Sequence, residues 1–504
     1  MTGDGGDLRR RLMGGSVIDA FVAQVEAAPT APAIRERTDT ISYSEIAQAA
    51  FGIGNQVVDR LGGESEPVLL LMAQGVRAIA STLAVLSAGK YYVPFDQRSP
   101  IGLIHDVVAR VQPTLILTEP EHLELARALG VASVLVVDQI DRALGSVPPV
   151  TDIDPNAKAY VYFTSGSTGA PKGVIDTHRN VLNNSFRYAT TLGFDASDCM
   201  SLIQSPSSSG VVGTQFGALC SGGALCPVDI FGRDAPEEIA ISLRKNAITV
   251  FHANPSLFQF FTELRLGETE SLRLVRLEGD RATSADVGLL RQAYGSDVTL
   301  VNGLGATECG LIRQLFVRPG EQVSSGPLPV GYAVPDTEVE VLGPDGAKIA
   351  TGEEGEVVVR SDYLAAGYWN DAVLTADRFR RDVDGGRVYH TGDVGRLGPD
   401  GLLELIGRTD DQVKVRGATL NLGAVEAIIL AQPGVTGALV GVEDSPRPRR
   451  LVASVTCEPG AEPDNDRIRQ AILERLPTAA IPTIRHVESL PTTSAGKLER
   501  SKGG

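Results

Sequence analysis

Small hydroxyl side chains, glycines and one lysine are concentrated in residues 164–173, which read TSGSTGAPKG. The apolar segment 159–163 precedes them directly, so the sequence predicts a strand that runs into a loop. Glycines let backbone N–H groups turn around an anion, hydroxyls add donors, and Lys172 supplies positive charge, which suits a triphosphate. The loop lacks the Gly-Lys-[Ser/Thr] ending of a Walker A motif. A flexible Ser/Gly linker is the alternative, but it predicts neither the apolar strand before the loop nor the Pro-Lys-Gly run after it.

The elements that must position this loop follow an α/β pattern. Apolar runs such as 68–72, 159–163 and 272–277 alternate with helical patterns, which predicts largely parallel sheets. Between residues 326 and 360 the pattern changes to short strands and turns, which indicates a smaller β subdomain. A polar break at 408–412 predicts a hinge followed by a compact α+β domain. We therefore expect two domains, 1–409 and 410–504.

Length, charge and composition restrict the class of protein. At 504 residues the chain is too long for one core, and its net charge of −16 argues against a nucleic-acid partner. No apolar run is long enough to span a bilayer, and the N-terminus lacks a signal-peptide pattern, so we expect a cytoplasmic protein without a membrane partner. The five cysteines have neither metal-ligand spacing nor the even count of a disulfide framework.

The loop at 164–173 resembles the phosphate loop of the adenylate-forming superfamily, which comprises acyl-CoA synthetases, nonribosomal-peptide adenylation domains and luciferases. Segments 41–46 and 86–96 look like two early structural motifs of the peptide-synthetase members, and further motifs follow in family order over nearly the whole chain. The resemblance implies a large N-terminal domain of mainly parallel sheets flanked by helices, with a small β subdomain, hinged to a small α+β C-terminal domain. It also implies that the loop binds ATP through Thr164, Ser165, Gly166, Ser167, Thr168, Gly169 and Lys172.

Residues 302–308, NGLGATE, resemble a second nucleotide motif of the superfamily. The resemblance implies that Asn302, Gly303, Leu304 and Gly305 contact the nucleotide and that Thr307 donates to the α-phosphate. Glu308 would hold Mg²⁺, a cation that stays mostly hydrated and takes one or two protein carboxylates. Leu304 stands where relatives usually have an aromatic ring, so we expect weaker stacking on adenine.

Residues 389–393, YHTGD, resemble the ribose-binding motif, in which Asp393 accepts from both ribose hydroxyls and Arg408 reinforces it. His390 replaces the lysine or arginine that is commoner in peptide-synthetase domains, and we interpret it as a structural hydrogen-bonding group. The segment from 407 to 417 is similar to the hinge motif with Asp410 as pivot. Residues 491–500 resemble the C-terminal lysine motif, which makes Lys497 the candidate catalytic lysine: an ammonium that bridges the substrate carboxylate and the α-phosphate.

The acid-binding segment departs from the family pattern. Relatives that activate α-amino acids carry Phe-Asp-x-Ser with the aspartate on the substrate ammonium, whereas this chain has Ser207 in the place of that aspartate. A hydroxyl cannot compensate a desolvated ammonium. A shifted register, with an acid supplied by another loop, is the alternative. The same motif match implies a pocket lined by Ser207, Ser208, Val211, His252, Arg276, Glu278, Gly303, Leu311 and Ile312.

Arg276 and Glu278 share one strand face by period two, so they either pair with each other or read a polar substituent of the substrate, with Glu278 able to accept a displaced amine. The resemblance implies ATP- and Mg²⁺-dependent activation of a carboxylic acid as acyl-AMP. The acid is expected to lack an α-amino group or to carry a displaced amine, as a β-amino acid does. The acyl group would pass to a phosphopantetheine thiol of a carrier protein in trans, as in nonribosomal peptide synthesis and secondary metabolism. An acyl-CoA ligase, with CoA as acceptor, and a non-catalytic acyl- or nucleotide-binding homologue are the alternatives.

Overall fold

The computed structural model describes residues 13–37, 39–138, 145, 147–164, 171–230, 236–263, 270–295, 297–382, 384–409, 412–415, 418–443, 450–458, 460–461, 464–475 and 481–492. Sequence predictions for Ser165, Gly166, Ser167, Thr168, Gly169, Asp410 and Lys497 fall outside these residues. No helix within the described ranges is long and apolar enough to cross a membrane.

A nine-stranded sheet carries much of the candidate site. Its order is β15-β14-β13-β12-β11-β9-β10-β1-β2; the inner strands from β13 to β1 pair in parallel, and antiparallel strands close both edges. The strands are β1 (Pro32–Glu36), β2 (Asp39–Ser42), β9 (Cys199–Leu202), β10 (Ala224–Pro227), β11 (Val250–Ala253), β12 (Leu274–Glu278), β13 (Thr299–Ala306), β14 (Gly310–Val317) and β15 (Tyr332–Ala333).

A second sheet of seven strands positions the phosphate loop. Its order is β18-β8-β7-β4-β3-β5-β6. The strands are β3 (Pro67–Leu71), β4 (Tyr91–Phe95), β5 (Leu115–Thr118), β6 (Ser133–Val136), β7 (Lys158–Thr164), β8 (Lys172–Thr177) and β18 (Gly367–Tyr368). Thr164 pairs with Lys172 in the antiparallel β7–β8 ladder, so the strand expected before the loop is present and the loop joins the two strands.

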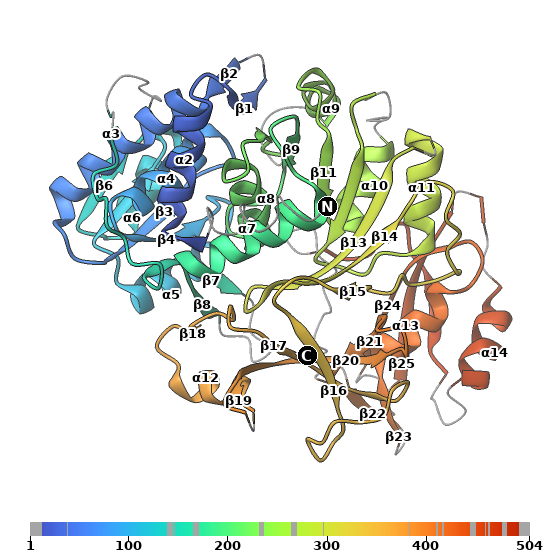
Figure 1. The fold of residues 1–504 in the computed structure, drawn as a ribbon. Coiled ribbons are helices and arrows are strands. Elements are labelled where there is room, and N and C mark those ends of the chain that lie inside the picture. The colour runs from blue at the N-terminus through green and yellow to red at the C-terminus, as the bar shows by residue number, and fades with distance from the viewer. Residues whose placement is uncertain are drawn as a thin grey trace.

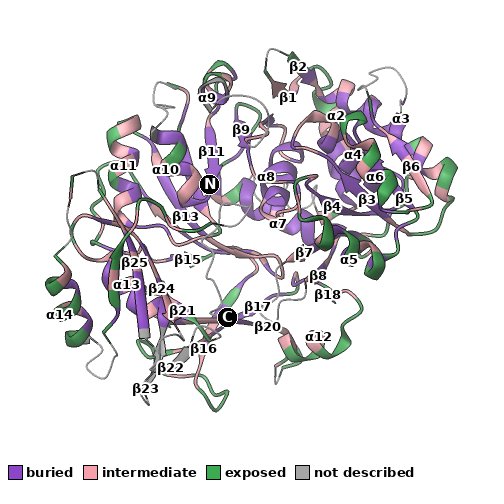
Figure 2. Cartoon of the chain, turned by 180° about the vertical axis from the view of Figure 1, so that it is seen from behind, coloured by how far each residue is buried: buried purple, intermediate pink, exposed green. Residues whose placement is uncertain are grey.

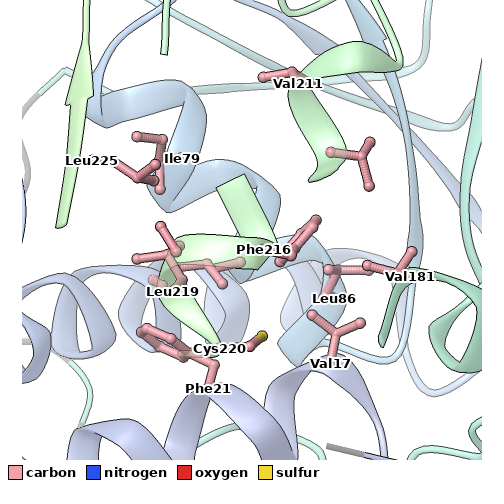
Figure 3. Close-up of a cluster of buried hydrophobic side chains, with 14 of the residues drawn as sticks. Val17, Phe21, Ile79, Leu86, Val181, Val211, Phe216, Leu219, Cys220 and Leu225 are labelled. Carbon is pink, nitrogen blue, oxygen red and sulfur yellow. The ribbon is translucent and has the colours of Figure 1, made fainter. Parts of the chain in front are cut away.

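Helices fill the space between the two sheets and cover their outer faces (Figure 1). The largest apolar cluster lies between the sheets, where Phe216 and Leu219 of α8 meet Phe21, Ile79 and Leu86 from other helices (Figure 3). The helices that contribute to this cluster are α2 (Val17–Ala27), α3 (Tyr43–Leu61), α4 (Val76–Ser87), α7 (His178–Leu192) and α8 (Gly210–Leu219). The helices against the outer faces are α5 (Ile101–Val111), α6 (Leu123–Ala128) after the 3₁₀ turn η1 (Pro120–His122), α9 (Pro236–Lys245), α10 (Pro255–Glu263) and α11 (Ser284–Tyr294).

Local sequence signals fix where the helices begin. Ser16 and Ser42 cap α2 and α3 in reciprocal capping boxes with Asp19 and Glu45. Thr177 caps α7 by accepting from the N–H of Asn180, which starts that helix directly after β8. The cap therefore sets the position of α7, whose later residues reach the candidate site.

The small β subdomain and the C-terminal domain complete the chain. The subdomain contains β16 (Glu338–Leu342), β17 (Glu354–Arg360), α12 (Ala372–Arg378), β19 (Phe379–Arg381), β20 (Arg387–Leu397) and β21 (Leu403–Arg408). After it follow β22 (Gln412–Val415), β23 (Ala418–Asn421), α13 (Leu422–Leu430), β24 (Val435–Glu443), β25 (Arg450–Cys457), α14 (Asn465–Arg475) and β26 (Thr483–His486). The helices α13 and α14 and the strands β24 and β25 share an apolar core of their own, and α14 turns an exposed face outward (Figure 2). The predicted fold class is confirmed: a large domain of mainly parallel sheets with a β subdomain and a small α+β domain.

Candidate active site

A pocket of about 140 Å³ opens at the carboxyl ends of β9, β11, β12 and β13, beside the start of α8. Ligands of open α/β sheets bind in this position. Four of its lining side chains are titratable. They are Tyr160, Tyr188, His252 and Glu278. Among the described residues that line the pocket, Glu278 is the sole acid.

All the polar contacts described for the Glu278 carboxylate fall on one oxygen, Oε2. Oε2 accepts hydrogen bonds from Nη2 and Nε of Arg276, at 2.7 and 3.1 Å, and from the hydroxyl of Tyr188 at 2.9 Å. Nε2 of His252 lies 3.4 Å from the same oxygen. Arg276 is completely buried, whereas Glu278 keeps 13% of its side chain exposed. The two residues therefore form an internal ion pair beneath the pocket, the first of the two possibilities that the sequence left open.

Two glycines of β13 make room for this ion pair. In the parallel β12–β13 ladder Glu278 lies opposite Gly303. A Cβ at Gly303 would lie 2.8 Å from Nη2 of Arg276, and a Cβ at Gly305 would collide with Oε1 of Glu278. The Arg276 guanidinium also stacks 4.2 Å from the centre of the Tyr188 ring. The glycines of β13 and the Tyr188 ring therefore border the space that the ion pair occupies.

The electrostatics of this cluster favour one protonation state. Burial raises the pKa of Glu278, but the charge of Arg276 and the contact with His252 outweigh burial and hold that pKa well below its usual range. Burial lowers the pKa of His252, so its imidazole is neutral near pH 7. Its Nδ1 lies 2.6 Å from the hydroxyl of Thr214. The cluster therefore holds one negative and one positive charge, and these cancel.

Ser207 lies in a chain of hydroxyls beside the pocket. Its Oγ is 2.8 Å from Oγ of Ser205, which donates to Oδ2 of Asp96 at 3.1 Å. Arg98 bonds both oxygens of Asp96, at 2.7 and 2.6 Å, so this carboxylate is already paired. The acid that the hydrogen bonds connect to Ser207 is therefore bonded by an arginine, which also pairs with Asp229 at 2.7 Å.

The predicted nucleotide residues lie along β13, β8 and β20. The Thr307 hydroxyl is 2.6 Å from that of Ser209, at the start of α8. Oε1 of Glu308 accepts from the Tyr368 hydroxyl at 2.9 Å, and Nζ of Lys172 lies 5.9 Å from the centre of the same ring. Tyr368 was not predicted from the sequence; its position near Lys172 and Glu308 depends on the pairing of β18 with β8.

The predicted ribose residues come together at the end of β21. Nη1 of Arg408 donates to Oδ1 of Asp393 at 2.9 Å. Nδ1 of His390 lies 3.1 Å from Oε2 of Glu356, and His390 is not among the described residues that line the pocket. Asn302 is nearly buried and donates to the carbonyl of Pro329 at 2.8 Å. Leu304 packs against the apolar core of the β subdomain.

Only some of the residues predicted for the acid pocket line the pocket in the structure. Ser208, His252, Glu278 and Leu311 line it, whereas Ser207, Arg276 and Gly303 lie outside the described lining. Val211 instead packs in the cluster between the sheets (Figure 3), and Ile312 packs in the core of the β subdomain. Ile312 follows the pocket residue Leu311 on β14, so its side chain points to the opposite face of the sheet. Val211 lies on helix α8, where successive side chains are rotated by about 100°. Tyr188 contributes to the site without any sequence signal beyond the apolar pattern of α7.

Comparison with known proteins gives the family. The model of the AMP-binding enzyme matches residues 21–369, and that of the AMP-binding enzyme C-terminal domain matches residues 424–497. The chain belongs to the AMP-binding enzyme family. Its resemblance to the adenylate-forming superfamily is thereby confirmed.

Several relatives are large peptide synthetases. Malpinin synthetase of Mortierella alpina is 32% identical over 95% of this chain and 6% of its own length. Tyrocidine synthase 1 of Brevibacillus parabrevis is 29% identical over 97% of this chain and 44% of its own length. The chain thus spans less than half the length of these two relatives.

Solved structures share the fold at lower identity. Klebsiella oxytoca NpsA in complex with 3-hydroxyanthranilyl-AMSN has a TM-score of 0.84 and 22% identity, covering 96% of this chain and 98% of that chain. The anthranilate CoA ligase AuaEII in complex with anthranoyl-AMP has a TM-score of 0.81 and 20% identity, covering 96% and 95%. At these identities the two structures show the fold alone.

Proposed function

We propose that the chain activates a carboxylic acid with ATP and Mg²⁺ as acyl-AMP and then transfers the acyl group to the phosphopantetheine thiol of a carrier protein in trans. The acid lacks an α-amino group or carries its amine on another carbon. Membership of the AMP-binding family supports the first half-reaction. Kinship with multidomain peptide synthetases supports a carrier as the acceptor.

One observation supports this substrate class most strongly: among the described residues that line the pocket, no unpaired carboxylate faces an α-ammonium. Ser207 occupies the place of the family's aspartate, Asp96 is held by Arg98, and Glu278 is held by Arg276. An ammonium buried without a counter-charge costs several kcal/mol. An acid without that group avoids the cost.

The remaining assignments follow the superfamily motifs that the sequence resembles. Glu308 is the proposed Mg²⁺ ligand, and a single carboxylate suits this largely hydrated ion. Among the described residues no group of three or more His, Cys, Asp or Glu side chains could hold a metal by itself. Thr307 is proposed for the α-phosphate, Asp393 with Arg408 for the ribose, and Lys497, outside the described residues, for the carboxylate and the α-phosphate. This chemistry needs alignment and charge neutralisation rather than a side-chain nucleophile.

An acyl-CoA ligase is the second candidate, because a histidine at the position of His390 is frequent in the acyl-CoA synthetases. The test is to incubate the protein with ATP, Mg²⁺ and a panel of acids, and to follow pyrophosphate release and thioester mass with either a holo carrier protein or CoA as acceptor. The proposal expects pyrophosphate in both reactions and rapid thioester formation on the carrier. Faster transfer to CoA would replace the carrier by CoA, and absence of acyl-AMP with every acid would refute the activity itself.

A further inference from the structure

The two carboxylate oxygens of Glu278, Oε1 and Oε2, differ in their contacts. All the contacts described for the carboxylate fall on Oε2, and no described residue donates to Oε1. Oε1 lies over Gly305, where a side chain would collide with it, and Glu278 and Gly305 both line the pocket. The pocket therefore contains one strong acceptor that is available to a ligand.

The charge around this acceptor has already been cancelled. Arg276 is fully buried and lies 2.7 Å from Oε2, so the pair carries no net charge. The other titratable groups of the lining are neutral, because burial lowers the pKa of His252 and raises the pKa of the Tyr160 and Tyr188 hydroxyls. A ligand ammonium placed against Oε1 would add an uncompensated positive charge close to a buried guanidinium. An uncharged O–H or N–H group would gain a hydrogen bond to a carboxylate without that cost.

The volume limits the size of the ligand. A cavity of roughly 150 Å³ in another protein holds one benzene ring. The pocket here is of similar volume, about 140 Å³, and its walls include Ile203, Val212 and Leu257 beside the polar groups. A single substituted ring, or an aliphatic acid of similar bulk, fits this space.

We propose that Glu278 selects a small carboxylic acid, of about the bulk of one ring, that carries an uncharged hydrogen-bond donor, either a hydroxyl or an aryl amine, for Oε1. The inference rests on the proposed function and narrows its substrate class: a displaced amine is accepted when it is uncharged and rejected when it is an ammonium. Arg276 acts through Glu278 as a positioning residue that neutralises it.

The test uses a matched series of acids on the wild-type protein. The series comprises benzoate, hydroxybenzoate, aminobenzoate and aminomethylbenzoate, with the substituent at the ortho or meta carbon. The aryl amine is uncharged at neutral pH because its lone pair is conjugated with the ring, whereas the aminomethyl group is protonated. ATP–pyrophosphate exchange gives kcat/KM, and calorimetry in the presence of AMP gives acid binding independently of turnover.

We expect kcat/KM for hydroxybenzoate or aminobenzoate to exceed that for benzoate by about 10- to 100-fold, which corresponds to one hydrogen bond to a charged group. The aminomethyl acid should fall below benzoate. Equal values for benzoate and its donor-bearing analogues would overturn the inference, and so would a preference for the ammonium. Both results leave adenylation standing. If no acid is exchanged or bound, the inference and the proposed function fail together.

Arg276→Met provides the decisive variant, because it leaves Glu278 uncompensated. We expect the ranking to invert in favour of the aminomethyl acid by about 10-fold or more. Arg273→Met is the matched control: this arginine directly precedes β12 and pairs with Asp198, but it is 40% exposed and outside the pocket lining. It should keep the wild-type ranking. An unchanged ranking in folded Arg276→Met would overturn the role of charge cancellation.

The buried position of Arg276 makes a second variant useful. Glu278→Gln keeps a side chain of the same shape and removes the negative charge, so the advantage of a donor-bearing acid over benzoate should shrink by about 10-fold. Retention of the full advantage in Glu278→Gln would overturn the inference. Should neither variant fold, the wild-type acid series decides.

Discussion

Removal of the Tyr188 hydroxyl is a sharp test of the Glu278 cluster. Tyr188→Phe deletes one donor, at 2.9 Å, to Oε2 of Glu278. The ring remains to pack on Gly213 and to stack on Arg276. A hydrogen bond to a charged group contributes about 1.5–3 kcal/mol. Because two donors of Arg276 still bond the same oxygen, we expect the lower end, about 1.5 kcal/mol, lost from the free energy of unfolding.

The sole tryptophan makes this loss measurable. Trp369 lies in the large domain, 5.9 Å from the ring of Tyr91, so its fluorescence during denaturation reports the unfolding of that domain. Tyr332→Phe is the matched control, since it removes a hydroxyl that donates to Asp400 at 3.1 Å on the surface. We expect the control to change stability by less than about 0.5 kcal/mol. For Tyr188→Phe, KM for the acid should rise while KM for ATP stays constant. Equal stability losses in the two variants would refute the account of the cluster.

Four further changes test other parts of the account. Glu308→Gln should weaken the dependence of adenylation on Mg²⁺, and an unchanged magnesium titration would remove Glu308 from the metal site. Ser207→Asp should slow adenylation of the native acid by about 10-fold or more, because it adds an unpaired carboxylate beside it; a rate for that acid equal to wild type would contradict this. Lys497→Ala should abolish adenylate formation and largely spare thiolation from supplied acyl-AMP, whereas an equal loss of both steps would contradict a role for Lys497 in the first half-reaction alone. Burial lowers the pKa of His178 to about 4 from 6.5, so the unfolded chain binds more protons between these values and stability falls as pH drops from about 6.5 to 4. Over this range the wild type should lose about 3 kcal/mol more than His178→Gln in denaturant unfolding, and parallel pH profiles would exclude His178 as the cause.

Much of the fold could be predicted because it depends on local pattern. The apolar run before the phosphate loop became β7, and the alternation of strands and helices became two mainly parallel sheets. The spacing of Arg276 and Glu278 indicated a shared face, which allowed their pairing to be considered. The sequence could not decide between pairing and substrate contact, because that depends on Tyr188 and on two glycines of a neighbouring strand.

The rest of the pocket depends on packing between segments far apart in the chain. Val211 and Ile312 carry side chains suited to a pocket wall, but their elements turn them into separate apolar cores. Tyr368 approaches Glu308 only through the pairing of β18 with β8, which spans almost two hundred positions of the chain and has no local signature. Long-range contacts of this kind are set by the global fold rather than by the neighbouring residues.

The most direct test of the central claim is ATP–pyrophosphate exchange by the wild-type protein with two sets of acids. One set contains the standard proteinogenic α-amino acids, and the other contains acids without an α-ammonium, including their α-hydroxy analogues and hydroxy- or amino-substituted aryl acids. We expect exchange with members of the second set and near-background exchange with the first, because neither Ser207 nor the paired Glu278 can compensate an α-ammonium. Strong exchange with a standard α-amino acid would contradict it.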